Sequence, residues 1–197
     1  MKAVRVSDAI QRRTTWTRAD FHDPDGRVER ASRGYSLRFF GKRVTIKRGL
    51  SLQELKTQFG DRFIGELIFH GNLGLNEGIN ELWTLVCGTG ATKFDSTNAY
   101  TGVGDSSTSE NATQTGLQAA TNKQYKAMDS GYPTYGSNQK ATWKSTYGTG
   151  DANFTWNECT VANGNSDSAK NLNRKVQSMG TKTSAISRIL TLDITLA

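Results

Sequence analysis

The sequence is poor in the residues that cross-link small proteins, with two Cys and two His among its 197 residues. Neither Cys87 nor Cys159 has a second Cys or a His at metal-ligand spacing, which argues against a zinc-stapled or disulfide-dense scaffold. We predict no metal site and no cofactor. Both cysteines are predicted to be buried, reduced thiols, and a disulfide between them stays open as an alternative.

Long apolar stretches are also absent. No run of about 18 apolar residues occurs, which excludes a membrane-spanning helix. Residues 1–13 carry scattered charges and no apolar segment, so we expect no secretory signal peptide, a soluble protein and no membrane partner. Four Trp, eight Phe and six Tyr still supply apolar area for a core, which argues against disorder along the whole chain.

Positive charge is abundant, and it is concentrated in the first third of the chain. Residues 1–70 contain 15 Lys or Arg against 8 Asp or Glu, whereas residues 71–197 contain 10 of each kind. Most of these cations are Arg, which binds carboxylates and phosphates through two parallel hydrogen bonds. The excess therefore fits an acidic face of a neighbouring subunit, or nucleic acid held through its phosphates, or a solvated arm.

We favour the subunit contact, because no known nucleic-acid-binding motif is present. The predicted contact residues are Arg5, Arg12, Arg13, Arg18, Arg27, Arg30, Arg33, Arg38, Lys42 and Arg43.

Three segments are predicted along the chain. Residues 1–34 are polar and contain the turn sequence Asp23-Pro24-Asp25-Gly26, so they are expected to form a basic extended arm. Residues 35–70 are expected to form a β-hairpin around Gly41 and a short helix over 52–59, which begins with a capping box at Ser51 and Glu54. Residues 71–197 are expected to hold a helix and a β-sandwich.

The helix of the third segment is predicted from its periodicity. Ile79, Leu82, Trp83 and Val86 recur at helical spacing, Asn76 can cap the start, and glycines at 88 and 90 can end it. On this interpretation Glu77 and Glu81 lie on the outer, solvated face.

Short segments separated by Gly, Asn, Ser and Asp predict the strands of the third segment. They lie at residues 100–103, 123–128, 141–147, 153–161, 172–179 and 186–196. In the last strand Leu190, Leu192 and Ile194 alternate with Thr191 and Asp193, which predicts one buried and one wet face. The fold class is therefore mainly β, an antiparallel β-sandwich or jelly-roll-like domain with one or two short helices and the basic N-terminal arm and hairpin.

The sequence offers no convincing catalytic group. Ser106 follows a Gly-Asp pair, but it has no nucleophile-elbow motif. The histidines that could activate it, His22 and His70, are interpreted as surface or hydrogen-bonded side chains without a catalytic role. We predict that the chain is not an enzyme and has no catalytic residues.

Two structural predictions concern the predicted strands. Glu158 lies in an apolar, aromatic segment and would be costly to bury alone, so a cation, Arg174 or Lys182, should pair with it. Gly102 and Gly104 predict a bulge or a close approach of another backbone or side chain. Trp143, Tyr147 and Trp156 are assigned to core packing, and no cation is close to Trp156 in the sequence.

Several short motifs occur in a recognisable order over residues 72–197. They are N-A-Y-T-G-V-G-D at 98–105, T-G-L at 115–117, G-D-A-N-F-T-W-N-E at 150–158, N-L-N-R at 171–174 and G-T-K-T at 180–183, before the terminal strand. In this order they resemble a family of tailed-bacteriophage virion proteins, tail-fibre-like or uncharacterised structural proteins. The basic first third lies outside the resemblance.

The resemblance implies a non-enzymatic virion component, made in the host cytoplasm and associated with the tail, neck or fibre. Its expected partners are copies of itself, in a homo-oligomer, and other capsid, neck or tail subunits. Two alternatives stay open. They are a capsid decoration, or cement, protein on the phage head and, more distantly, a nucleic-acid-binding module that uses the basic segment.

Overall fold

The fold was taken from a computed structural model of the chain, which describes residues 12–21, 28–31, 34–39, 42–47 and 63–196. These residues form thirteen strands and one helix, so the predicted mainly β class is confirmed. The elements are β1 (Arg12–Phe21), β2 (Val28–Ala31), β3 (Gly34–Phe39), β4 (Lys42–Lys47), β5 (Phe63–His70), β6 (Leu73–Gly74), α2 (Asn76–Cys87), β7 (Tyr100–Gly104), β8 (Lys123–Ala127), β9 (Thr134–Ser137), β10 (Lys140–Tyr147), β11 (Glu158–Ala162), β12 (Asn173–Val176) and β13 (Ser187–Leu196).

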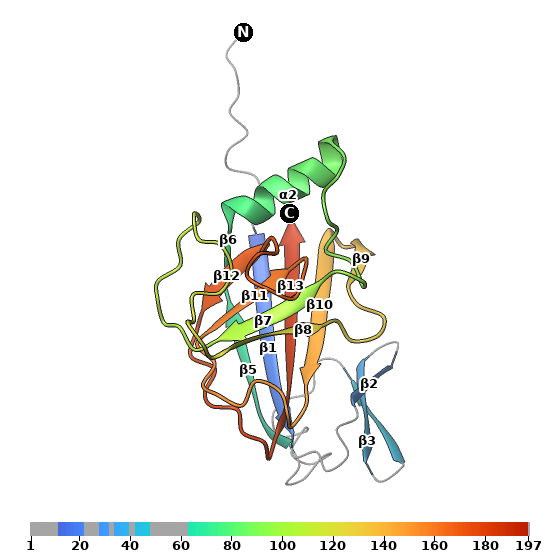
Figure 1. Ribbon diagram of the computed structural model, residues 1–197. Helices are drawn as coiled ribbons and strands as arrows, with labels where there is room; N and C mark the ends of the chain where they lie inside the picture. Colours follow the sequence, from blue (N-terminus) through green and yellow to red (C-terminus); the bar gives the residue numbers. More distant parts are fainter. Residues whose placement is uncertain (1–11, 22–27, 32–33, 40–41, 48–62, 197) are drawn as a thin grey trace.

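Two five-stranded antiparallel sheets form the body of the molecule. The first has the order β5-β1-β13-β10-β9 and the second β6-β12-β11-β7-β8, while β2, β3 and β4 form a separate three-stranded sheet. The second sheet lies across the strands of the first (Figure 1). Side chains from both sheets share one buried cluster, so the arrangement is sandwich-like.

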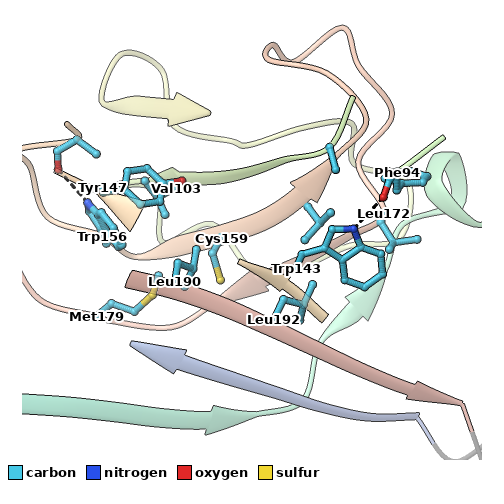
Figure 2. Close-up of a cluster of buried hydrophobic side chains, with 13 residues drawn as sticks. Phe94, Val103, Trp143, Tyr147, Trp156, Cys159, Leu172, Met179, Leu190 and Leu192 are labelled. Atoms are coloured by element: carbon cyan, nitrogen blue, oxygen red, sulfur yellow. Dashed lines mark hydrogen bonds between the residues drawn. The ribbon is translucent and has the colours of Figure 1, made fainter. Parts of the chain in front are cut away.

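The core lies between the two sheets (Figure 2). The first sheet contributes Trp143, Tyr147 and Leu190, and the second contributes Val103 and Cys159. Trp143 is buried and its indole N–H donates to the carbonyl of Phe94 at 3.1 Å, so the ring is packed without losing its polar partner. The predicted core role of Trp143 and Tyr147 is confirmed.

Strand β13 was predicted to have one wet face, and this is wrong for its first half. Leu190 and Leu192 are fully buried as expected, but Ile189 and Thr191 on the opposite face are also only 4% and 6% exposed. The strand lies between β1 and β10 in the middle of its sheet. A period of two identifies the inner face, but it does not show whether the other face is also covered.

Strand β1 is the main departure from the predicted arm over residues 1–34. Its ten residues pair with β13 on one side, and seven of them pair with β5 on the other. Thr, Trp and Phe in this segment favour extended structure, although the segment is polar and precedes the turn sequence at 23–26. The first sheet therefore combines strands from both sides of residue 71, where the segment boundary was drawn.

The hairpin predicted around Gly41 is confirmed, because β3 and β4 pair in antiparallel register from Gly34↔Lys47 to Phe39↔Lys42. The short helix predicted over 52–59 lies outside the described residues.

Helix α2 is present where the periodicity placed it, but Asn76 is not its cap. The N-cap is Leu75, in extended conformation and with no side-chain cap hydrogen bond. Leu75 is fully buried and its N–H donates to the carbonyl of Leu172 at 3.2 Å. Tertiary packing therefore fixes the start of the helix where a capping side chain was expected. At the other end the Gly88 N–H donates to the Thr84 carbonyl, as the predicted stop requires.

Candidate functional site

Glu158 in β11 and Arg174 in β12 form a completely buried ion pair. Arg174 Nε donates to Glu158 Oε2 at 2.7 Å, and both side chains are 0% exposed. The sequence predicted a cation beside Glu158, and the structure brings Arg174 to it. Lys182, the other candidate, is also buried, and its Nζ donates to Asn153 Oδ1 at 2.9 Å.

The Glu158 carboxylate also holds the connection between β7 and β8. Its Oε2 accepts the backbone N–H of Gln118 at 3.0 Å, and its Oε1 accepts that of Ala119 at 2.7 Å. These two N–H groups and the Arg174 guanidinium together give the Glu158 carboxylate three hydrogen-bond donors. The three donors replace most of the hydrogen bonds to water that the carboxylate loses on burial.

The Arg174 guanidinium binds the same connection further upstream. Its Nη1 donates to the carbonyl of Thr108 and to Gln114 Oε1, both at 2.9 Å. Its buried Nη2 has no hydrogen-bond partner among the described residues. The pair therefore fixes both ends of the 108–119 segment against β11 and β12.

Gly104 leaves the space that the Glu158 carboxylate occupies. A Cβ at Gly104 would lie 2.4 Å from Glu158 Oε1, and one at Gly102 would lie 2.8 Å from the Tyr125 ring. The register of β7 with β11 and with β8 runs without interruption, so neither glycine marks a bulge. Of the two predicted roles, close approach is the one present.

The two carboxylates of helix α2 face the body of the protein, which corrects the solvated outer face predicted for them. Glu77 Oε1 accepts the backbone N–H of Asn171 at 2.9 Å. Glu81 Oε1 accepts the N–H of Thr92 at 2.8 Å and Nδ2 of Asn163 at 3.1 Å. These hydrogen bonds hold the helix to the loop between β11 and β12 and to the connection between α2 and β7.

Helix α2 correspondingly turns large apolar side chains outward. Leu82 is 39% exposed, Trp83 62% and Val86 73%, and among residues 71–195, whose burial the structure describes, Tyr135 at 78% is the remaining exposed large hydrophobic. The helical period identified these positions, but the face they form points to solvent.

Trp156 is fully buried against a cation that the sequence interpretation missed. The Arg188 guanidinium lies 4.7 Å from the centroid of the Trp156 ring, and the Tyr147 ring lies edge-on at 4.8 Å. Arg188 comes from β13, 32 positions away in the sequence, so a search of neighbouring residues does not find it. The core assignment of Trp156 is confirmed, and the cation beside its ring comes from a distant part of the sequence.

The two cysteines are free, and they lie in different environments. Cys159 is buried as predicted, whereas Cys87 at the end of α2 is exposed, which corrects its predicted burial. Burial raises the pKa of the Cys159 thiol, and the adjacent Glu158 carboxylate raises it further.

The basic residues predicted to contact other subunits fall mostly on strands. Those in described strands are Arg12, Arg13 and Arg18 in β1, Arg30 in β2, Arg38 in β3, and Lys42 and Arg43 in β4. Arg5, Arg27 and Arg33 lie outside the described residues. The structure thus spreads this set over two sheets.

The described part of the chain contains no group of three or more His, Cys, Asp and Glu side chains able to hold a metal ion. The Ser106 hydroxyl donates to Thr108 Oγ1, and His70 lies in β5, while His22 is outside the described residues. No helix among the described residues is long and apolar enough to cross a membrane.

Comparison with known proteins gave no match to a protein-family model, to a curated protein or to a solved structure. Functional inference for this chain therefore depends on its own geometry and on the order of its motifs.

Proposed function

We propose that this chain is a non-enzymatic structural component of a tailed-bacteriophage virion, associated with the tail, neck or fibre, which assembles through subunit–subunit contacts. The observation that carries the proposal is the exposed face of α2, where Leu82, Trp83 and Val86 lie together on a helix. Contiguous exposed apolar side chains on a folded domain mark a surface that another molecule covers.

The positions that carry the family resemblance support the same function. Gly104, Glu158 and Arg174 form one buried network that fixes the β7–β8 connection to the second sheet. The charges of Glu158 and Arg174 neutralise each other inside the fold. This fits a scaffold that must keep its shape within an assembly. A catalytic role would require reactive groups accessible to a substrate.

Placement on the tail, neck or fibre follows from the resemblance, and decoration of the head is the alternative. Both placements require the protein to be a stoichiometric part of the finished particle. They differ in the structure on which it is found.

Particles of the phage that carries this sequence provide the test. We expect the chain to co-purify with virions through a density gradient, and gold-labelled antibody to mark the tail, neck or fibre in electron micrographs. Label on the head would favour the decoration protein. Absence from gradient-purified particles in which the other structural proteins are detected would overturn the proposal.

A further inference from the structure

The exposed apolar residues of α2 form a stripe suited to helix packing. Leu82, Trp83 and Val86 follow the partly buried Ile79 at positions i+3, i+4 and i+7, which lie on one side of a helix. Stripes with this spacing are what one helix presents to another in ridge-and-groove packing.

Within α2, the side of the helix that carries the stripe contains no charged residue. The helix contains two ionisable carboxylates, Glu77 and Glu81, and both accept hydrogen bonds from the body of the protein. The exposed polar neighbours are Asn76, Asn80 and Thr84, which can donate and accept hydrogen bonds. Two identical copies of this face can therefore meet without like-charge repulsion.

The distribution of exposed apolar side chains favours a partner that presents the same face. A head-to-tail contact needs two different complementary patches on each subunit, whereas a two-fold contact needs one self-complementary patch. Among residues 71–195 the exposed large hydrophobics are the three on α2 and the isolated Tyr135 at the β9–β10 hairpin. Within residues 71–195 these side chains form one patch, as a two-fold contact requires.

The area is of the right size for the centre of a dimer interface. A Trp side chain offers about 150–250 Å², so Trp83 at 62% exposure leaves roughly 100–150 Å² accessible. With Leu82 and Val86 the stripe offers on the order of 300 Å², or about 600 Å² for two facing copies. Standard protein–protein interfaces bury at least about 1,200 Å² in total, and somewhat more than half of that area is apolar.

We propose that the outward face of α2 packs against the same face of a second copy of this chain about a two-fold axis. The resulting pair has Trp83 at its centre and the uncharged Asn and Thr side chains at its rim. The inference specifies one of the subunit contacts invoked in the proposed function and rests on it for its biological setting, but the purified chain can test it alone.

Sedimentation equilibrium of the full chain measures this association directly. The weight-average mass is expected to rise from 21.6 kDa toward twice that value as the concentration increases. Trp83→Ser should weaken the dimer at least about 100-fold, since a Trp at the centre of an interface is removed from both partners. Tyr135→Ser is the matched control, because it removes another exposed aromatic ring away from α2 and should leave the association unchanged.

A folding defect is excluded by measuring thermal unfolding of each variant, and Val86→Ser, at a 73% exposed position, provides a second variant. A wild-type chain that stays monomeric at all concentrations would overturn the proposal. A dimer that is weakened by neither Trp83→Ser nor Val86→Ser would also overturn the proposal, because the two copies would then be in contact through another surface.

The thiol of Cys87 reports on the face independently. It is exposed one helical turn after Trp83, while Cys159 is buried. Maleimide labelling of Cys87 should therefore slow as the wild-type concentration rises, and it should not slow for Trp83→Ser. Slow labelling at all concentrations would mean that another part of the same chain covers the face, and this would also overturn the proposal.

The two proposals fail in different experiments. A chain that dimerises through α2 but is absent from particles would refute the virion assignment and leave the interface intact. A chain that is present in particles but monomeric when purified would do the reverse.

Discussion

Replacing Glu158 by Gln tests whether the buried ion pair organises the second sheet. Gln has nearly the same shape and keeps one carbonyl acceptor, so the substitution removes the charge with little change of volume. Arg174 would remain 0% exposed with a full charge and without the carboxylate that pairs with it. The Glu158→Gln variant would also leave the N–H groups of Gln118 and Ala119 to share one acceptor oxygen.

The expected loss of stability is large. Breaking a buried pair by removing one partner costs about 3–5 kcal/mol, because the remaining charge stays buried without compensation. For a chain of this size each kcal/mol lowers Tm by about 2–4 °C, so Tm should fall by roughly 6–20 °C. Urea titration followed by circular dichroism, at matched protein concentration, gives the free energy of unfolding directly.

Two controls separate a buried pair from ionic interactions in general. The double variant Glu158→Gln/Arg174→Met removes the unpaired charge, and it should recover at least about 1 kcal/mol relative to Glu158→Gln alone. Lys126→Met breaks a partly exposed pair with Asp151, and its cost should stay below about 1 kcal/mol. A loss below about 1 kcal/mol for Glu158→Gln would refute the reasoning.

Three further predictions test a close contact, the burial of one thiol and the pairing of β1. Gly104→Ala should destabilise the fold by about 1–3 kcal/mol in the same urea titration, since its Cβ would meet the Glu158 carboxylate; an unchanged midpoint would contradict that close approach. Ellman's reagent at mildly alkaline pH should titrate Cys87 quickly and Cys159 only after unfolding, because burial raises the pKa of the latter thiol; two fast thiols would be inconsistent with this. Amides of Arg12–Phe21 that pair with β13 and β5 should exchange slowly with deuterium, whereas an extended arm would exchange at once.

The strands that the sequence revealed are those whose pattern is local. β7, β8, β10 and β13 lie within about two residues of their predicted limits, because turn residues flank them and, in β13, apolar residues alternate with polar ones. β1 has no such alternation, and its place in the sheet comes from pairing with β13, more than 160 positions away in the sequence. Pairing at that separation leaves no periodic trace in the strand itself.

The ion pair between Glu158 and Arg174 was partly predictable from the sequence, because burying a lone charge is energetically costly. The cost of burying Glu158 alone indicates that a cation is needed, although only the fold shows that Arg174 is the one in contact. The Arg188–Trp156 contact has no comparable signal, since neither residue requires the other in order to be buried. The contact between Arg188 and Trp156 arises only because the fold places β13 beside the segment that contains Trp156.

Helix α2 shows why a periodic pattern does not fix orientation. The spacing of Ile79, Leu82, Trp83 and Val86 defines a helix with one apolar side, and burial of that side is the usual inference. Here contacts on the opposite side decide the orientation. Gly78 packs so tightly on the backbone of Leu172 that a Cβ added at Gly78 would lie 2.4 Å from the Cα of Leu172. On the same side of the helix, Glu77 and Glu81 both accept hydrogen bonds from loop amides. Once that side is held to the protein, the side formed by Leu82, Trp83 and Val86 is left exposed, and for this reason the proposed subunit contact depends on the orientation of α2.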